Sequence, residues 1–156
     1  MLRSGVPKSG KSTMARELSV RYGITHLDLD QLAWSEPGVR RSLADSTREI
    51  AEFVDTHEEW VAEGCYADLI ELMLAAATEV RFLNPGTEAC VANCEARPWE
   101  PEKYSSKEEQ DSRLQFLIAW VRQYETRQDE YSMASHRALF DRYNGPKKEH
   151  NEQRFS

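Results

Sequence analysis

The chain has 156 residues, a length that suits one domain with a single hydrophobic core. Hydrophobic residues make up 40% and charged residues 30%, a globular balance that excludes a mostly disordered chain. The formal net charge of −7 argues against binding of bulk nucleic acid or of an anionic membrane, because both need a basic surface. Three cysteines, with no apolar leader or membrane-length segment, predict a cytoplasmic protein with reduced thiols.

A phosphate-binding loop is predicted at the start of the chain, from Gly5 to Ser12. Its sequence, GVPKSGKS, matches the pattern G-x-x-x-x-G-K-[ST] at every fixed position. In such a loop the backbone N–H groups and the N-terminus of the next helix bind phosphate oxygens. The lysine reaches the β- and γ-phosphates, and the hydroxyl coordinates Mg²⁺. We therefore predict ATP and Mg²⁺ as cofactors, with Ser12 as a metal ligand and the nucleotide held by Gly5, Pro7, Lys8, Ser9, Gly10, Lys11, Ser12 and Thr13.

The segment in front of this loop is short. Only Met1 to Ser4 precede Gly5, and Arg3 stands where a buried central strand is normally apolar and about five residues long. Either the first strand is short, or the natural start of the protein lies upstream of Met1. We favour the second explanation, because so short a strand would anchor the loop poorly.

The rest of the chain alternates between predicted strands and helices, a pattern typical of a parallel sheet covered by helices. Strands are predicted at 24–30, 59–64 and 79–84. Helices are predicted at 10–22, 42–57, 68–77, 87–96, 114–124 and 132–143, with loops at 35–42 and 97–106 where prolines interrupt. Residues 1–145 are expected to form one domain, and the polar tail 146–156 is expected to fray without a clear fifth strand.

Acidic residues follow two of the predicted strands. Alternation along a strand would place Asp28 and Asp30 on one side with Leu29 facing the core, at the edge where α/β sheets bind ligands. Asp28 could hold Mg²⁺ through water and Asp30 could accept a proton from a substrate hydroxyl, or both could simply cap the following turn. Glu63 could orient the metal's water shell or contact substrate, or it could be a solvated strand end.

Four arginines are candidates to bind substrate and to stabilise transferred charge, because the guanidinium group offers five donors in a planar fork. They are Arg40 and Arg41 in the loop at 35–42, Arg97 before Pro98, and Arg127 after the long helix. The alternative is that each is an ordinary surface charge. Together with Asp30, Glu63 and Gly64, Arg40 and Arg41 form the predicted substrate set.

Several short segments resemble the small P-loop kinases, adenylate kinase and shikimate kinase. GVPKSGKST resembles the adenylate kinase loop, with Pro7 in the same place. LDLDQLAW is similar to the Asp-x-Asp stretch of shikimate kinases, and EARPW to their Arg-Pro-Leu-Leu stretch. WVAEGCY is similar to a Trp-Val-Ile-Asp-Gly-Asn-Tyr stretch of the FlaR-related proteins, an adenylate kinase-like group labelled as DNA topology modulation proteins. The resemblance is closest to this group and covers Gly5 to about Phe140.

The resemblance implies a three-layer α/β/α P-loop NTPase fold with a short helical lid at about 97–112. Its sheet would be parallel with the order 2-3-1-4-5, although no clear fifth strand is predicted here. Of the residues it implies, Asp30 would face the phosphoryl acceptor, Arg97 and Arg127 would belong to the lid and its base, and the catalytic set would be Lys11, Asp30, Arg97 and Arg127. Neither AMP nor shikimate is implied as substrate, because the segments that select them are absent or reduced.

The favoured hypothesis is an enzyme that transfers the γ-phosphoryl group of Mg·ATP to an unidentified small acceptor bearing a hydroxyl or a phosphate. The alternative is a nucleotide-binding regulatory protein with little or no kinase activity. The short first strand, the short lid, and Asn93 at a position where a lid arginine is common favour this alternative. A nucleic-acid modulator is suggested only by the family label, and the net charge of −7 opposes it.

Overall fold

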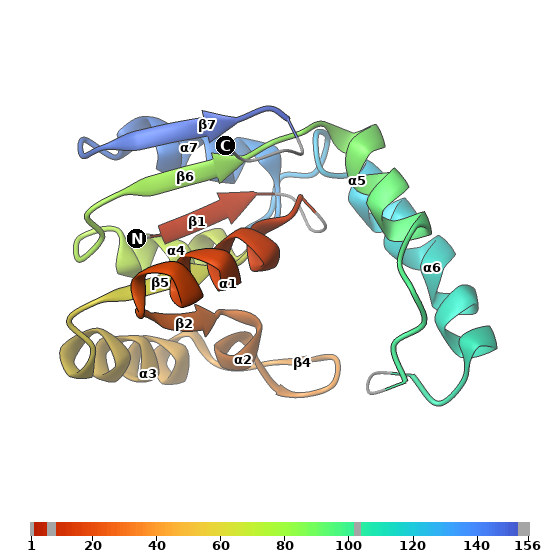
Figure 1. Ribbon diagram of the computed structural model, residues 1–156, viewed down its shortest axis with the longest axis horizontal. Helices are drawn as coiled ribbons and strands as arrows, with labels where there is room; N and C mark the ends of the chain where they lie inside the picture. Colours follow the sequence, from red (N-terminus) through yellow and green to blue (C-terminus); the bar gives the residue numbers. More distant parts are fainter. Residues whose placement is uncertain (1, 6–8, 102–103, 153–156) are drawn as a thin grey trace.

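The computed structural model describes residues 2–5, 9–101 and 104–152 of the chain. Five parallel strands form one sheet in this part of the protein, with helices on both of its faces (Figure 1). Across the sheet the strands are β2 (Thr25–Asp28), β5 (Trp60–Glu63), β1 (Leu2–Gly5), β6 (Val80–Leu83) and β7 (Lys147–His150). Numbered along the chain, they have the order 2-3-1-4-5.

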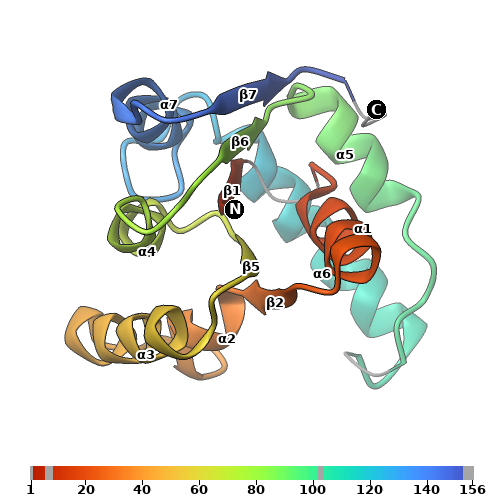
Figure 2. The same ribbon diagram turned by 60° about the vertical axis from the view of Figure 1, so that its left-hand side comes forward.

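The helices connect these strands in the alternating manner that the sequence predicts. They are α1 (Lys11–Tyr22), α2 (Asp30–Ala33), α3 (Leu43–Thr56), α4 (Ala67–Met73), α5 (Thr87–Glu95), α6 (Lys107–Arg122) and α7 (Met133–Arg142). In the turned view of Figure 2, α1 lies on one side of the sheet, and α4 and α7 lie on the other. Helices α5 and α6 pack together and extend past the carboxyl ends of the strands (Figure 1).

The central strand β1 is short but has a neighbour on both sides. In β1, Leu2 pairs with Ala62 of β5 on one side and with Val80 of β6 on the other. This strand has four residues, the same length as each of the other four strands in the sheet. Every residue of β5 is buried, as expected for a parallel strand with neighbours on both edges. The sheet that carries the predicted loop is therefore narrow along the strand direction throughout.

The prediction that the tail would fray is wrong for residues 147–150, which form the edge strand β7. Polar side chains suit an edge strand because one of its sides faces solvent. Lys147 Nζ donates hydrogen bonds of 2.8–2.9 Å to three carbonyl oxygens at the end of α7. Arg137 of α7 forms an ion pair with Glu149 at 2.7 Å. Strand β7 is thus stabilised by polar contacts with α7, and its sequence lacks the apolar pattern that indicates a buried strand.

Two other segments differ from the prediction. Residues 35–42, predicted as loop, contain a short antiparallel hairpin of β3 (Trp34–Glu36) and β4 (Val39–Arg40). The hairpin turns at Gly38, whose φ of 80° lies in the region that favours glycine. Helix α6 begins at Lys107, earlier than the predicted start at residue 114, and Ser106 Oγ caps it by accepting a hydrogen bond from Glu109 N at 3.1 Å. No helix in the described ranges is both long and apolar enough to span a membrane.

Candidate active site

A cleft of about 1280 Å³ opens at the carboxyl ends of the strands. One wall is the start of α1, a second is formed at the ends of β2 and β5, and the segment after α5 lines a third side. Its lining residues belong to the strand ends, to α1 and to the arm made by α5 and α6, which extends past the strand ends in Figure 1. Open α/β sheets bind their ligands at this edge, so the cleft is the candidate active site.

The start of α1 forms the wall where phosphate binding is predicted. Residues 6–8 lie outside the described residues, and with them the predictions for Pro7 and Lys8. Gly10 has a φ of 92°, and its carbonyl oxygen accepts a hydrogen bond from Met14 N at 3.0 Å, which begins the helix. Lys11 follows as the first residue of α1 and is 7% exposed. The residues of the predicted nucleotide set that line the cleft are Ser9, Gly10, Lys11, Ser12 and Thr13.

Two hydroxyl groups on this wall suit a triphosphate and its metal ion. Ser12 Oγ donates a hydrogen bond of 2.7 Å to Glu63 Oε1, so the hydroxyl expected on Mg²⁺ lies beside a carboxylate. Ser9 is 1% exposed, and its Oγ has no hydrogen-bond partner among the described residues. A buried hydroxyl without a partner costs free energy, and a phosphate oxygen would supply that partner. The residues present therefore fit the predicted nucleotide.

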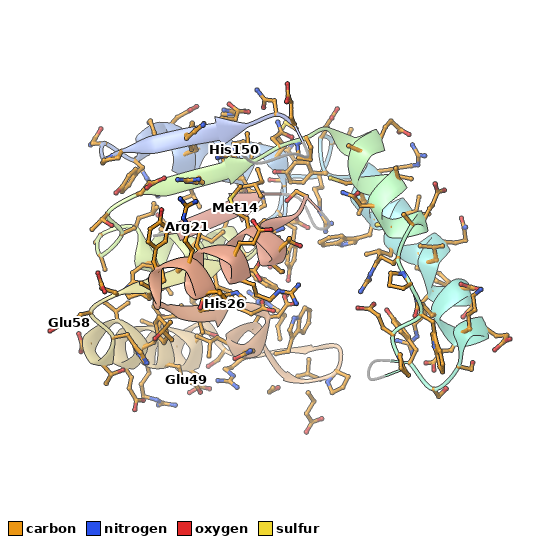
Figure 3. All side chains as sticks on the ribbon, in the orientation of Figure 1. Met14, Arg21, His26, Glu49, Glu58 and His150 are labelled. Carbon is orange, nitrogen blue, oxygen red and sulfur yellow. The ribbon has the colours of Figure 1, made fainter. Side chains whose placement is uncertain are left out.

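Three carboxylates line the cleft beside this wall: Asp28 at the end of β2, Asp30 at the start of α2 and Glu63 at the end of β5. Glu63 is 3% exposed, and its Oε1 lies 3.6 Å from Nε2 of His26, a β2 residue labelled in Figure 3. Burial, with Glu63 as the main neighbouring charge, raises the pKa of Asp28 to about 6. Bringing a cation to this cluster would favour the ionised carboxylates, because opposite charge offsets the cost of burial.

A magnesium ion fits this cluster only together with other ligands. Within the described residues, no three or more His, Cys, Asp or Glu side chains form a metal site by themselves. Mg²⁺ usually keeps several waters and binds through one or two carboxylates and the phosphates of the substrate. Ser12, Asp28 and Glu63 are the side chains that could hold it, directly or through water.

Asp28 and Asp30 reach the cleft through a turn. The prediction that alternation along one strand places them there is wrong. Strand β2 ends at Asp28, Leu29 takes a helical conformation, and Asp30 begins α2. Asp28 Oδ1 accepts a hydrogen bond of 2.9 Å from Asp30 N, so Asp28 also caps the turn, as the alternative proposed. Leu29 is fully buried and donates from its backbone N to Glu63 O at 2.9 Å.

Gly64 allows this turn to pack closely against the end of β5. A Cβ atom placed on Gly64 would lie 2.9 Å from Cβ of Leu29, closer than real Cβ contacts allow. The glycine lines the cleft beside Cys65, whose pKa burial raises to about 12. The thiol therefore stays protonated and does not serve as a nucleophile. The role of Gly64 that the structure supports is close packing between the two strand ends.

Tyr66 is a residue of the cleft that sequence reasoning missed. Its hydroxyl donates a short hydrogen bond to Asp30 Oδ1 and accepts one of 2.9 Å from Trp34 Nε1. Burial and the bond to Asp30 raise the pKa of Tyr66, so the phenol remains a donor. The pair Trp34 and Tyr66 thus fixes the orientation of the Asp30 carboxylate. The resemblance around WVAEGCY ended on this tyrosine and was the signal that could have found it.

The four candidate arginines are held by carboxylates. Arg97 lines the cleft and forms an ion pair with Glu100, which lines it too, whereas the other three arginines are not among the lining residues. Their partners are Asp68 for Arg40, Glu49 for Arg41 and Asp129 for Arg127. Arg40 also lies over the ring of Tyr66, 4.9 Å from its centroid. Their assignment to substrate therefore stays a prediction.

A buried histidine contacts the backbone of Cys65, one of the residues that line the cleft. His136 of α7 is fully buried, with Nε2 at 2.8 Å from the carbonyl oxygen of Cys65 and Nδ1 at 2.9 Å from the Tyr124 hydroxyl. Because a carbonyl only accepts, Nε2 carries the proton and Nδ1 accepts from the tyrosine. Burial lowers the pKa of His136 to about 4, so the ring is neutral near pH 7. Sequence spacing gave no sign of this contact.

The fold and the loop together define a class of protein. A parallel sheet of order 2-3-1-4-5, with the loop between β1 and α1, is the three-layer α/β/α fold of the P-loop NTPases, and this prediction is confirmed. No family model matches the chain, and no curated protein matches it.

Similarity is found among solved structures. A sugar kinase from Janibacter sp. HTCC2649 is similar with a TM-score of 0.54 and 14% identity, over 99% of this chain and 85% of that one. A protein from Eubacterium ventriosum ATCC 27560 gives 0.50 and 12% identity, over 97% and 89%. Shikimate kinase from Acinetobacter baumannii, solved with shikimate, gives 0.45 and 18% identity, over 88% and 89%. At these identities the likeness shows the fold alone.

Proposed function

We propose that the protein is a phosphotransferase that moves the γ-phosphoryl group of Mg·ATP to a small-molecule acceptor. One observation carries the proposal: Lys11 and Ser12 at the start of α1 share a single cleft with the carboxylates Asp28, Asp30 and Glu63. The first pair suits a triphosphate, and the carboxylates suit a metal ion and a general base. A phosphotransferase agrees with the resemblance to the FlaR-related proteins and to other small P-loop kinases. In this proposal the protein is a cytoplasmic enzyme of one domain, with a lid at about 97–112.

In the proposed reaction the acceptor oxygen attacks the γ-phosphorus. The new oxygen–phosphorus bond forms while the bond between the γ-phosphorus and the β,γ-bridging oxygen breaks, and ADP leaves with that electron pair. Asp30 takes the proton of the attacking hydroxyl, and Lys11 stabilises negative charge on the transferred group. Mg²⁺, when bound, would neutralise charge on the phosphate oxygens. The protein contributes position and charge and forms no covalent intermediate.

The second candidate function is the nucleotide-dependent regulator. The ion pair of Arg97 with Glu100 favours it, because the arginine expected in the lid is already held by a carboxylate inside the cleft. An acceptor-dependent rise in ADP formation separates the two functions. A regulator would bind Mg·ATP with the same affinity and show no such rise.

Calorimetric titration with Mg·ATP tests the proposal at its first step. The wild-type chain is expected to bind, and Lys11→Ala is expected to lose binding, because the charge on the β- and γ-phosphates is no longer matched. Arg21→Ala is the matched control, since Arg21 lies in the last turn of the same helix (Figure 3) and does not line the cleft. A folded wild-type chain that binds no Mg·ATP would refute the proposal.

A further inference from the structure

The wall at the ends of β2 and β5 carries acidic side chains and has no lysine or arginine among its described residues. Over the whole cleft, the described lining residues with a lysine or arginine side chain are Lys11, Arg16 and Arg97. The first two lie on α1, where the triphosphate is proposed to bind. The third is paired with Glu100. An acceptor bound beside Asp30 would therefore meet the Asp30 carboxylate, and no lysine or arginine among the described residues of that wall.

The other three candidate arginines, which could have offset the negative charge of this wall, form ion pairs outside the cleft lining. Arg40 donates to Asp68 at 2.8 Å and lies against aromatic rings, and Arg127 donates to Asp129 at 2.6 and 2.8 Å. Arg41 is paired with Glu49, which belongs to α3 and is labelled in Figure 3. Bringing any of them to an anionic acceptor would first require breaking an ion pair, which leaves a carboxylate without its partner.

Asp30 itself presents an acceptor and not a donor to the cleft. Its Oδ1 already accepts the Tyr66 hydroxyl, and an ionised carboxylate has no hydrogen to give. A hydroxyl or ammonium group can donate to such an oxygen, whereas a carboxylate or phosphate on the acceptor can only repel it. Both the charge of this wall and its hydrogen-bonding capacity select the same kind of molecule.

On the basis of the proposed phosphotransferase function, we propose that the acceptor is a hydroxyl compound without an anionic group, either neutral or positively charged. Polyols, neutral sugars, amino sugars and nucleosides belong to this class, and sugar acids and phosphate monoesters do not. The reacting hydroxyl gives its proton to Asp30 and receives the γ-phosphoryl group, so the acceptor leaves as a phosphate monoester together with ADP. Repulsion from the Asp30 carboxylate acts on any anionic group of the acceptor that approaches the same wall.

The test follows radioactive phosphate from γ-labelled Mg·ATP into matched sets of acceptors. One set is glucose, glucosamine and glucuronate, a second is adenosine and AMP, and a third is glycerol and glycerol 3-phosphate. Within a set that is used, the neutral or cationic member is expected to have a kcat/KM at least about tenfold above its anionic counterpart. Label that goes preferentially into anionic members would overturn the proposal. Label that appears only as inorganic phosphate with every acceptor would overturn it too.

A charge substitution on the wall at the ends of β2 and β5, called the acceptor wall from here on, gives an independent measurement. Gln31 is exposed, lines the cleft and belongs to α2, next to Asp30. Gln31→Arg adds a cation there and is expected to raise the ratio of anionic to neutral turnover by roughly tenfold. Gln31→Met, which has a similar size and no charge, is expected to leave the ratio unchanged. An equal ratio in both variants would overturn the role of charge.

Failure of this proposal is separable from failure of the proposed function. The Mg·ATP titration is run on the same preparation, without any acceptor. Binding of Mg·ATP with transfer to anionic acceptors rejects the acceptor class and keeps the phosphotransferase. Absence of Mg·ATP binding rejects both.

Discussion

The two walls of the cleft are assembled in different ways. The phosphate wall comes from one run of residues, 9–13, at the start of α1. The acceptor wall comes from separate segments: the end of β2, the start of α2 and the end of β5 with the residues that follow it. A wall made from one segment depends on local backbone shape, whereas a wall made from several depends on contacts that hold them together. Residues far from the cleft should therefore affect the acceptor wall more than the phosphate wall.

Asp30→Asn should give the largest effect and should separate the two walls. The amide keeps an oxygen that can accept from Tyr66 but cannot take the proton of the attacking hydroxyl. We expect acceptor-dependent ADP formation to fall by roughly 10²- to 10⁴-fold while the Kd for Mg·ATP is unchanged. Asp45→Asn on α3, where the carboxylate is exposed, is the control. Equal turnover of Asp30→Asn and wild type would remove Asp30 from the mechanism.

Acid should destabilise the protein through His136. Its pKa is about 4 in the folded protein against an ordinary 6.5, so the unfolded chain binds a proton more readily. This contribution to stability is complete above pH 6.5 and is lost as pH falls toward 4. The loss amounts to about 3 kcal/mol in the free energy of unfolding.

The measurement is urea unfolding at pH 7.5 and 4.5, for the wild type and for His136→Gln. Other groups titrate in this range, so the informative quantity is the difference between the two proteins. A pH dependence of the same size in both would show that His136 does not carry the effect. Because His136 contacts the Cys65 carbonyl, we also expect the variant to impair acceptor turnover more than Mg·ATP binding.

The contrast between the walls also explains how much could be predicted from the sequence. The phosphate-binding loop from Gly5 to Ser12 could be predicted because its pattern is local, and it stays a prediction. The strand–helix alternation is also local, and the parallel sheet that it predicts is confirmed. The edge strand β7 was missed because its polar residues are stabilised by α7, through contacts such as Arg137 with Glu149. Tyr66 and His136 were missed because their partners lie 36 and 71 residues away along the chain. Single-sequence spacing carries no record of such contacts.

Gly64→Ala should disturb the acceptor wall through packing alone. The new methyl group would meet Leu29 at 2.9 Å, and Leu29, which stands between Asp28 and Asp30 in the sequence, is fully buried in the hydrophobic core. We expect a loss of about 2 kcal/mol in the free energy of unfolding. We also expect a raised KM for the acceptor with little change in the Kd for Mg·ATP. Gly23→Ala is the control for a positive-φ glycine with open space around it.

Should Gly64→Ala lose stability but leave the KM for the acceptor unchanged, as the control Gly23→Ala is expected to leave it, the close approach at Gly64 would not be what positions the acceptor wall. The two glycines differ in the cause of their cost. At Gly23 the φ of 66° disfavours a side chain, whereas at Gly64 the space is already filled by Leu29. Only the substitution at Gly64 is expected to change the cleft, because Gly64 lines it and Gly23 does not.

Tyr66→Phe should have the smallest effect, because it leaves Asp30 in place and removes only the group that orients it. A hydrogen bond to a charged group contributes about 1.5–3 kcal/mol, part of which water would restore here, so we expect kcat to fall roughly tenfold. Tyr131→Phe is the matched control, since its ring lies edge-on to Tyr66 at 5.5 Å. A fall in kcat with an unchanged Kd for Mg·ATP and an unchanged unfolding midpoint identifies positioning. A lowered unfolding midpoint together with the lowered kcat would instead make Tyr66 a packing residue of this wall.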